Sequence, residues 1–188
     1  MLKGIIPYAH QLLKTTVNKG DNVIDATCGN GNDTLLLASL VGDTGHVYAF
    51  DIQDQAITTT TNLLKQHHYE NVSVVKDSHA NLKKYLDADH IKQIGGAIFN
   101  LGYLPRSDKQ VITKSSSTLP AIKQILDYLQ KGRLLILVVY HGHEGGDTEK
   151  NDILAFTKQL DQKQYSVATY QFINQRNCPP FVIAIEKR

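Results

Sequence analysis

The stretch Val23-Ile24-Asp25-Ala26-Thr27-Cys28-Gly29-Asn30-Gly31-Asn32-Asp33 decides the fold of this chain. The two β-branched residues at its start predict a buried strand, and the pattern from Thr34 to Val41 predicts a helix directly after it. The glycines between them permit backbone conformations that other residues avoid, and they let a ligand approach the backbone closely. A strand, a glycine turn and a helix in this order therefore predict a ligand-binding loop.

Strands and helices alternate along the rest of the chain. Strands are expected at residues 23–24, 46–50, 72–75, 96–99, 134–140, 165–172 and 181–186, and helices at 34–41, 53–67, 81–86, 117–129 and 151–160. This alternation predicts an α/β fold with a mostly parallel sheet of six or seven strands and helices on both faces. Only about eight residues separate the last two strands, too few for a parallel crossover, so an antiparallel final strand is expected. Pro120 is expected in the first turn of its helix, where its missing N–H is harmless.

Length and composition are those of an ordinary globular protein. The 188 residues are 41% hydrophobic and 20% charged, which predicts one domain over residues 1–188 and argues against disorder. The longest apolar run, 134–140, is too short to span a membrane, and the apolar patch near the N-terminus is broken by Pro7 and His10, unlike a signal peptide. Cys28 and Cys178 lack the spacing of a disulfide framework or a zinc site and predict free thiols in a cytoplasmic protein.

Charge is unevenly distributed along the chain. The net charge is only +2, but residues 76–133 carry ten basic and five acidic side chains. This middle part is either the face that meets an anionic partner or a solvated basic surface.

The glycine loop differs from the fingerprint of a dinucleotide site. That fingerprint reads G-x-G-x-x-G, with a pyrophosphate above the helix N-terminus, whereas Thr34 stands here in place of the third glycine after Gly29 and Gly31. Asp25 and Asp33 put carboxylates at both ends of the loop. Carboxylates repel a pyrophosphate but suit a ligand with a positive ammonium, so the loop favours S-adenosylmethionine.

The ends of the next two predicted strands carry residues that could complete a cofactor site. Asp51 can accept hydrogen bonds from both hydroxyls of a ribose, and Gln53 could reach the ribose or the adenine. Asp77, Ser78 and His79 follow the third strand, where the adenine edge would lie. The plain alternative is that Asp51, Asp77 and Ser78 cap helices.

The fourth predicted strand ends in Phe99-Asn100-Leu101-Gly102-Tyr103-Leu104-Pro105. Methyl transfer to nitrogen is an in-line displacement, so positioning of the nitrogen lone pair supplies much of the rate. The amide of Asn100 can orient an amino group, and Tyr103 can stack on a planar base. Leu104, Pro105 and Arg106 are expected to contact the substrate. A turn with a core tyrosine is the alternative.

Two polar loops, 140–146 and 174–180, are expected at the same edge of the sheet. No metal is expected at His141 and His143, because no third ligand stands at a suitable spacing. A proton-handling or substrate role fits histidine better, with a mobile glycine-rich loop as the alternative. The second loop suits contacts to bases or phosphates, or it is a stiff hairpin connection. We expect a catalytic role for His141 and substrate contacts from Tyr140, His143, Asn174, Arg176 and Asn177.

These motifs resemble those of the Rossmann-like class I S-adenosylmethionine-dependent methyltransferases. D-A-T-C-G-N-G-N-D matches their first motif and Asp51 their second, while Asn100 and Tyr103 occupy the ends of the [DN]-P-P-[YF] motif of amino-methylating members. This chain departs from that motif in having Leu101 and Gly102 in place of the two prolines.

Five ordered motifs narrow the resemblance. D-A-T-x-G-N-G-x-D, H-V-Y-A-F-D-I-Q, F-N-L-G-Y-L-P, V-V-Y-H-G-H and F-I-N-Q-x-N-x-P-P-F are similar to those of one bacterial family that carries an older rRNA methylase label and is associated with tRNA. The resemblance implies methylation of the amino group of 5-aminomethyl-(2-thio)uridine at the wobble position, position 34. It also implies a set of residues around the cofactor: Asn30, Asn32, Asp51, Gln53, Ser78 and His79.

The function expected from this resemblance is an S-adenosylmethionine-dependent tRNA methyltransferase that binds the anticodon loop. Arg106 and Arg176, with Lys109 and Lys114, are expected to contact phosphates, and a homodimer would widen the basic surface. The alternatives are an rRNA base methyltransferase, a small-molecule amine methyltransferase, and a non-catalytic nucleotide-binding or RNA-chaperone protein.

Overall fold

The computed structural model describes residues 1–89, 91–102, 112–142 and 144–188. Within these ranges, no helix is long and apolar enough to cross a membrane. The strands are β1 (Asn22–Asp25), β2 (His46–Asp51), β3 (Val72–Lys76), β4 (Gly96–Leu101), β5 (Leu134–Val139), β6 (Tyr165–Tyr170) and β7 (Phe181–Lys187). The helices are α1 (Ile5–Thr16), α2 (Asn32–Val41), α3 (Asp54–Gln66), α4 (Leu82–Ala88), α5 (Ser115–Tyr128) and α6 (Gly146–Lys158), with a 3-10 turn, η1 (His79–Asn81), before α4.

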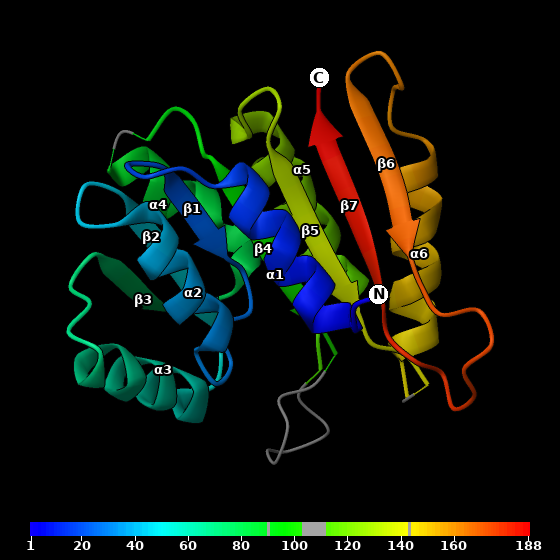
Figure 1. Ribbon diagram of the computed structural model, residues 1–188, viewed down its shortest axis with the longest axis horizontal. Coiled ribbons are helices and arrows are strands. Elements are labelled where there is room, and N and C mark those ends of the chain that lie inside the picture. The colour runs from blue at the N-terminus through cyan, green and yellow to red at the C-terminus, as the bar shows by residue number, and fades with distance from the viewer. Residues whose placement is uncertain (90, 103–111, 143) are drawn as a thin grey trace.

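The strands form one seven-stranded sheet in the order β3-β2-β1-β4-β5-β7-β6. The first five strands in this order are parallel, and β7 runs antiparallel to both β5 and β6. This confirms the expected Rossmann-like α/β fold with an antiparallel final strand. Asp25 pairs with Ala49 on β2 and with Ile98 on β4, so these strands end at one edge of the sheet, the lower edge in Figure 1.

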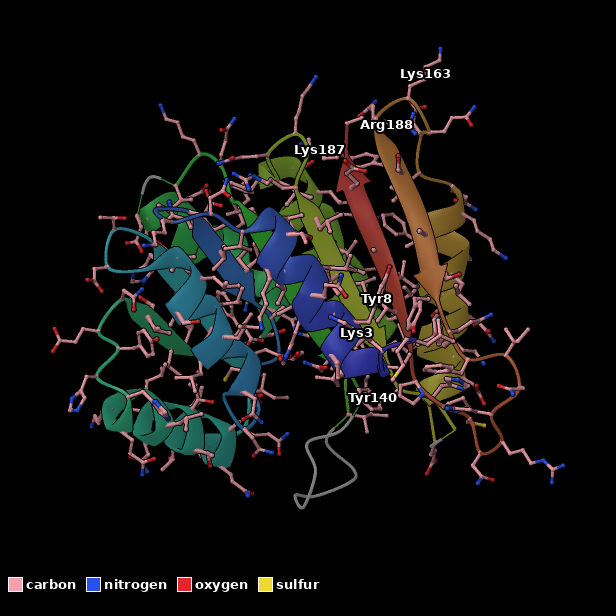
Figure 2. The ribbon with its side chains drawn as sticks, in the orientation of Figure 1. Lys3, Tyr8, Tyr140, Lys163, Lys187 and Arg188 are labelled. Carbon is pink, nitrogen blue, oxygen red and sulfur yellow. The ribbon has the colours of Figure 1, made fainter. Side chains whose placement is uncertain are left out.

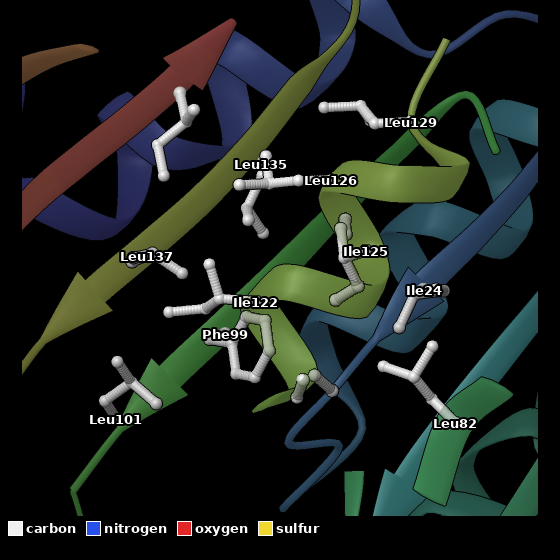
Figure 3. Packing of buried hydrophobic residues seen from close by; sticks show 14 of the residues in the cluster. Ile24, Leu82, Phe99, Leu101, Ile122, Ile125, Leu126, Leu129, Leu135 and Leu137 are labelled. Carbon is white, nitrogen blue, oxygen red and sulfur yellow. The ribbon is translucent and has the colours of Figure 1, made fainter. Parts of the chain in front are cut away.

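Helices cover both faces of the sheet (Figure 1). One core contains α1, α2 and α3 against one face, and the other contains α4, α5 and α6 against the opposite face. Figure 3 shows the second core, where Phe99 of β4 lies beside Ile122 of α5. The central strands are apolar on both faces because both faces are covered.

The N-terminal helix α1 is the element that the sequence analysis missed. Its buried residues, Ile5, Ala9 and Leu13, recur every four positions, which is the spacing of one helix face. The helix packs on β5, β7 and α2. Pro7 is its third residue, and the first amides of a helix have no partner within it, so the proline does not break the helix. The apolar patch that we expected to be interrupted is therefore a continuous stripe.

Three helices begin earlier than expected, and the first of them, α2, starts at Asn32 rather than Thr34. α5 starts at Ser115, which makes Pro120 its sixth residue, so the expectation that this proline lies in the first turn was wrong. The three serines before Thr118 extend the helix towards its N-terminus. α6 starts at Gly146 rather than Asn151, because Gly145 takes a left-handed conformation and acts as the N-cap.

We predict that truncation of the buried face of α1 destabilises the whole protein. Leu13 is fully buried, so Leu13→Ala should lower the free energy of unfolding by about 2–5 kcal/mol through lost apolar contacts and a cavity. Urea denaturation followed by circular dichroism measures this change. Leu2 is 77% exposed, and Leu2→Ala should change stability by less than about 0.5 kcal/mol. Equal effects of the two variants would contradict the packing of α1.

Candidate active site

A cavity of about 420 Å³ lies at the carboxyl edge of the parallel strands. Its walls are formed by residues that follow β1, β2, β3, β4 and β5, together with part of α1. This is the edge at which ligands bind in sheets of this kind. The following residues expected at a site line this cavity: Gly29, Asn30, Asn32, Asp33, Asp51, Gln53, Asp77, Ser78, His79, Asn100 and Tyr140.

The other expected site residues fall into two groups. Tyr103, Leu104, Pro105, Arg106 and His143 lie outside the described residues. The second group is described but is not part of the cavity wall: Asp25, Gly31, His141, Asn174, Arg176 and Asn177.

The glycine loop owes its shape to two left-handed residues. Gly29 has φ +50° and Gly31 has φ +82°. A Cβ atom on Gly31 would lie 3.0 Å from Oγ1 of Thr60 and 3.1 Å from the side chain of Leu63, both on α3. Gly31 thus lets the loop pack closely on α3, while Gly29 faces the cavity. The hydroxyl of Thr60 donates a hydrogen bond to the carbonyl of Gly29 at 3.1 Å.

Asp51 at the end of β2 connects this loop with the start of α3. Its Oδ2 accepts a hydrogen bond from the amide of Gly29 at 3.1 Å, and its Oδ1 accepts one from the amide of Gln53 at 3.0 Å. A carboxylate has about four acceptor sites. Asp51 can therefore hold the loop and still accept hydrogen bonds from a ligand's hydroxyls.

The sequence left open whether the residues after β3 cap a helix or line the site, and the structure shows that they do both. Asp77 accepts hydrogen bonds from Ser78, Asn81 and Tyr85, and the Asn81 hydrogen bond is the main cause of its lowered pKa. Ser78 caps η1 by accepting a hydrogen bond from Ala80. Both residues also line the cavity, so capping does not remove them from the site.

His79 presents a buried nitrogen without a partner. Its Nδ1 lies 3.0 Å from the carbonyl oxygen of Ala26, so Nδ1 carries the proton. Nε2 is buried and has no hydrogen-bond partner in the described part of the chain. Burial lowers the pKa of this imidazole, which favours the neutral form with Nε2 as an acceptor. Such an atom is ready to accept a hydrogen bond from a ligand.

Asp25 lies beneath the cavity and supports it. It is fully buried and accepts hydrogen bonds from the Thr34 hydroxyl at 2.6 Å and from the Thr27 amide at 3.2 Å. Burial, and then the charge of Asp33, raise its pKa to about 7. The hydroxyl of Thr27 in turn accepts a hydrogen bond from the backbone amide of Asn100 at 2.7 Å. Asp25 thus connects the glycine loop with the end of β4.

Three side chains from separate elements meet in the cavity wall. Asp33, at the start of α2, lies with Oδ1 2.5 Å from Nε2 of His10 on α1. Its Oδ2 accepts a hydrogen bond from the side-chain amide of Asn100 on β4. Only the amide of Asn100 was expected here for catalysis; the sequence analysis missed His10 because α1 was not predicted.

Gly102, directly after β4, and Thr113, before α5, are held together. Gly102 and Thr113 exchange hydrogen bonds: the Thr113 amide donates to the Gly102 carbonyl, and the Gly102 amide donates to the Thr113 hydroxyl, each at 2.9 Å. Glu149 of α6 is buried and accepts hydrogen bonds from the hydroxyls of Thr113 and Thr118, each at 2.6 Å. Thr113 also lines the cavity, a role that no sequence motif indicated.

The two polar loops lie side by side, and Tyr140 is the one residue of their described parts that lines the cavity. A Cβ on Gly142 would lie 2.6 Å from the Cβ of Cys178, so the loops touch there. His141 lies 3.4 Å from Asp147 and packs edge-on against Phe181, with ring centroids 5.9 Å apart. Asn174, Arg176 and Asn177 are exposed.

Residues 47–186 match the protein-family model described as "Putative rRNA methylase". This match covers more than half of the chain. The chain belongs to this rRNA methylase family. The resemblance to this family that the motifs suggested is thereby confirmed.

Several proteins of known sequence or structure are similar to this rRNA methylase family member over nearly its whole length. A chloroplastic tRNA (mnm(5)s(2)U34)-methyltransferase of Arabidopsis thaliana is 37% identical over 95% of this chain and 68% of its own. The structure of a "putative rRNA-methylase" from Clostridium thermocellum has a TM-score of 0.96 and 42% identity, with both chains fully covered. A "putative methyltransferase" from Streptococcus mutans in complex with SAH has a TM-score of 0.91 and 44% identity, again with full coverage of both.

We predict that Asp25 makes the stability of the methylase depend on pH. Its folded pKa of about 7 lies above the value of about 4 expected in the unfolded chain. The folded state therefore retains a proton that the unfolded state loses, and stability should decrease as pH rises from about 4 through 7. Urea denaturation at pH 5 and pH 8 should show a smaller difference for Asp25→Asn than for the wild type. An equal difference in both proteins would contradict the raised pKa.

Proposed function

We propose that this protein is an S-adenosylmethionine-dependent methyltransferase that converts 5-aminomethyl-(2-thio)uridine at tRNA position 34 to the methylaminomethyl form. The observation that carries the reaction type is the amide of Asn100, held by Asp33 in the wall of a cavity rich in carboxylates. The tRNA assignment is supported by the 37% identity to a tRNA (mnm(5)s(2)U34)-methyltransferase.

The cavity suits a cationic cofactor. Asp33, Asp51 and Asp77 line it, and no lysine or arginine does so in the described part of the chain. Asp51 is proposed to accept hydrogen bonds from ribose hydroxyls, and the unpartnered Nε2 of His79 is proposed to accept one from an N–H donor such as an adenine amino group. When bound, S-adenosylmethionine supplies a methyl group activated by a positively charged sulfur. The residues proposed to surround it are Gly29, Asn30, Asn32, Asp33, Asp51, Gln53, Asp77, Ser78 and His79.

Asn100 is proposed to orient the nitrogen that receives the methyl group. Its amide nitrogen is committed to Asp33, so its carbonyl oxygen is the part left to accept an N–H of the substrate amine. An amide holds an amine without forming a salt with it, and the lone pair can then point at the methyl carbon. Tyr103 is proposed to stack on the uracil ring, and His141 keeps a proposed role in proton handling.

The RNA is proposed to approach over α1 and the two polar loops. His10 lines both the cavity and a neighbouring groove on α1 whose other residues include Lys3 and Lys14. Figure 2 shows Lys3 and Tyr140 towards the carboxyl edge of the sheet, whereas Lys163, Lys187 and Arg188 lie at the opposite edge. The basic residues near the cavity suit phosphates of a single-stranded loop. The proposed substrate contacts are Leu104, Pro105, Arg106, Tyr140, His143, Asn174, Arg176 and Asn177.

We further propose that the protein acts on tRNA in the cytoplasm. We also propose that it forms a homodimer, which would widen the basic surface. Both rest on the sequence: on two cysteines without disulfide spacing, and on the small size of the chain relative to a tRNA.

Methylation of rRNA is the second candidate function, favoured by the family description. A ribosomal RNA small subunit methyltransferase H of Streptococcus equi is 33% identical, but over only 50% of this chain and 30% of its own. The shorter match makes this candidate the weaker one.

We predict that cells lacking this gene lose methylaminomethyl uridine from their tRNA and accumulate the aminomethyl precursor. Nucleoside mass spectrometry of purified tRNA and rRNA measures both pools, and a plasmid-borne copy of the gene should restore them. An unchanged tRNA profile together with a missing methylated nucleoside in rRNA would favour the second candidate.

We predict that Asn100→Ala slows methyl transfer by about two to three orders of magnitude, the usual cost of a lost positioning hydrogen bond at the reacting centre. The affinity for S-adenosylmethionine, measured by isothermal titration calorimetry, should change little. Asn62 is exposed on α3, away from the cavity, so Asn62→Ala provides a matched control with wild-type rates. Normal turnover by Asn100→Ala would contradict the role of this amide.

A further inference from the structure

The contact between His10 and Asp33 joins the N-terminal helix to the centre of the site. Nε2 of His10 lies 2.5 Å from Oδ1 of Asp33, and the side chains are 27% and 9% exposed. Both residues line the cavity, together with Asn100, whose amide donates to the other oxygen of Asp33. One carboxylate therefore holds an imidazole and an amide at the same time.

The contact with Asp33 determines which nitrogen of His10 carries the proton. A carboxylate only accepts hydrogen bonds, so the Nε2 of His10 must carry a proton. In the neutral ring, Nδ1 is then an acceptor. A carboxylate that holds a histidine in one tautomer also stabilises the imidazolium formed when the other nitrogen takes up a proton.

The proposed substrate requires such an acceptor. An alkyl amine has a pKa near that of lysine, about 10.4, so only about one molecule in a few thousand is unprotonated at pH 7. An ammonium has no lone pair and cannot attack a methyl carbon. The site must therefore remove a proton before or during methyl transfer.

The other titratable groups of the described cavity wall are poorly suited to this task. Asp51 is proposed to bind the ribose of the cofactor, and the hydrogen bond from Asn81 lowers the pKa of Asp77, which makes it a weaker base. The pKa of Tyr140 is raised by burial and then by the charge of Asp33, which keeps the phenol protonated. Burial likewise raises the pKa of the Cys28 thiol and lowers that of His79.

We propose that Nδ1 of His10 accepts the proton of the substrate ammonium and that Asp33 is the positioning residue for both His10 and Asn100. This inference rests on the proposed function, because it assumes an alkyl amine as the substrate. The proton passes from the ammonium to the imidazole. The lone pair freed on the nitrogen forms the new bond to the methyl carbon, and the electron pair of the carbon–sulfur bond stays on sulfur. The positive charge lost by the sulfur appears on the methylated amine, and the imidazolium returns its proton to solvent.

Several charged or titratable groups surround His10. Asp33 faces it from α2, with Asp25 behind, and Tyr140 lines the same cavity from the end of β5. Lys3 and Lys14 share the outer groove with the ring. Asp33 is thus in contact with the ring at 2.5 Å, and the two lysines lie on its outer side.

The pH dependence of the rate tests this role. His10→Gln keeps a polar side chain on the helix but cannot accept a proton at neutral pH. Single-turnover methylation of undermethylated tRNA should slow by about two to three orders of magnitude at pH 7. The rate of this variant should then rise about tenfold for each pH unit up to pH 9.5, because the free amine becomes more abundant. The wild-type rate should depend on pH much less steeply, and added imidazole should partly restore the variant.

Exposed His67 at the end of α3 provides the matched control. His67→Gln should retain the wild-type rate and pH profile. A His10→Gln variant that loses the same factor at every pH, or loses nothing, would overturn the proposal. If the wild-type enzyme itself fails to methylate the undermethylated tRNA, the proposed function fails instead, so the two failures can be distinguished.

A second readout does not depend on activity. Nitrogen-15 NMR of histidine-labelled protein at pH 8 should show His10 with its proton on Nε2 and an unprotonated Nδ1. Asp33→Asn should reduce this tautomer preference, while His79 should keep its proton on Nδ1 in both proteins. A proton on Nδ1 of His10 in the wild type would overturn the proposal.

Discussion

The parallel pairing of β1 with two neighbours is the constraint on which the rest of the structure depends. β1 is hydrogen-bonded to β2 on one side and to β4 on the other. Parallel strands end at the same edge, so the residues that follow these strands must converge there. The glycine loop, Asp51 and Asn100 come from different parts of the chain and reach one cavity for this reason. The turn of Gly31 against α3 keeps the start of α2 within reach of them.

Two buried carboxylates at this edge have opposite environments. Asp33 stands in the first turn of α2, where the helix N-terminus favours a negative charge, and it has His10 and Asn100 as partners. Asp25 is fully buried, and burial followed by the charge of Asp33 raises its pKa to about 7. Asp25, with its raised pKa, thus supports the loop, while Asp33 positions the side chains of His10 and Asn100.

Local patterns predicted most of the elements because each depends on short-range chemistry. The β-branched runs and the glycine turn identified the strands, and the short last connection identified the antiparallel pair. α1 was missed because Pro7 and His10 seemed to interrupt an apolar patch, although Ile5, Ala9 and Leu13 have helical spacing. The early start of α6 could not be predicted either, since it depends on a left-handed Gly145.

The sequence by itself determined the α/β fold, the edge at which the site forms and the acidic character of that site. These follow from periodicity, from the parallel topology and from the residue types at the strand ends. Only the tertiary structure decided which of those residues share the cavity wall. It placed Asp25 beneath the wall, left His141 outside it and added His10 from a helix 23 residues away from Asp33. The physical reason is that packing of α1 against the sheet, not sequence spacing, determines which imidazole meets the carboxylate.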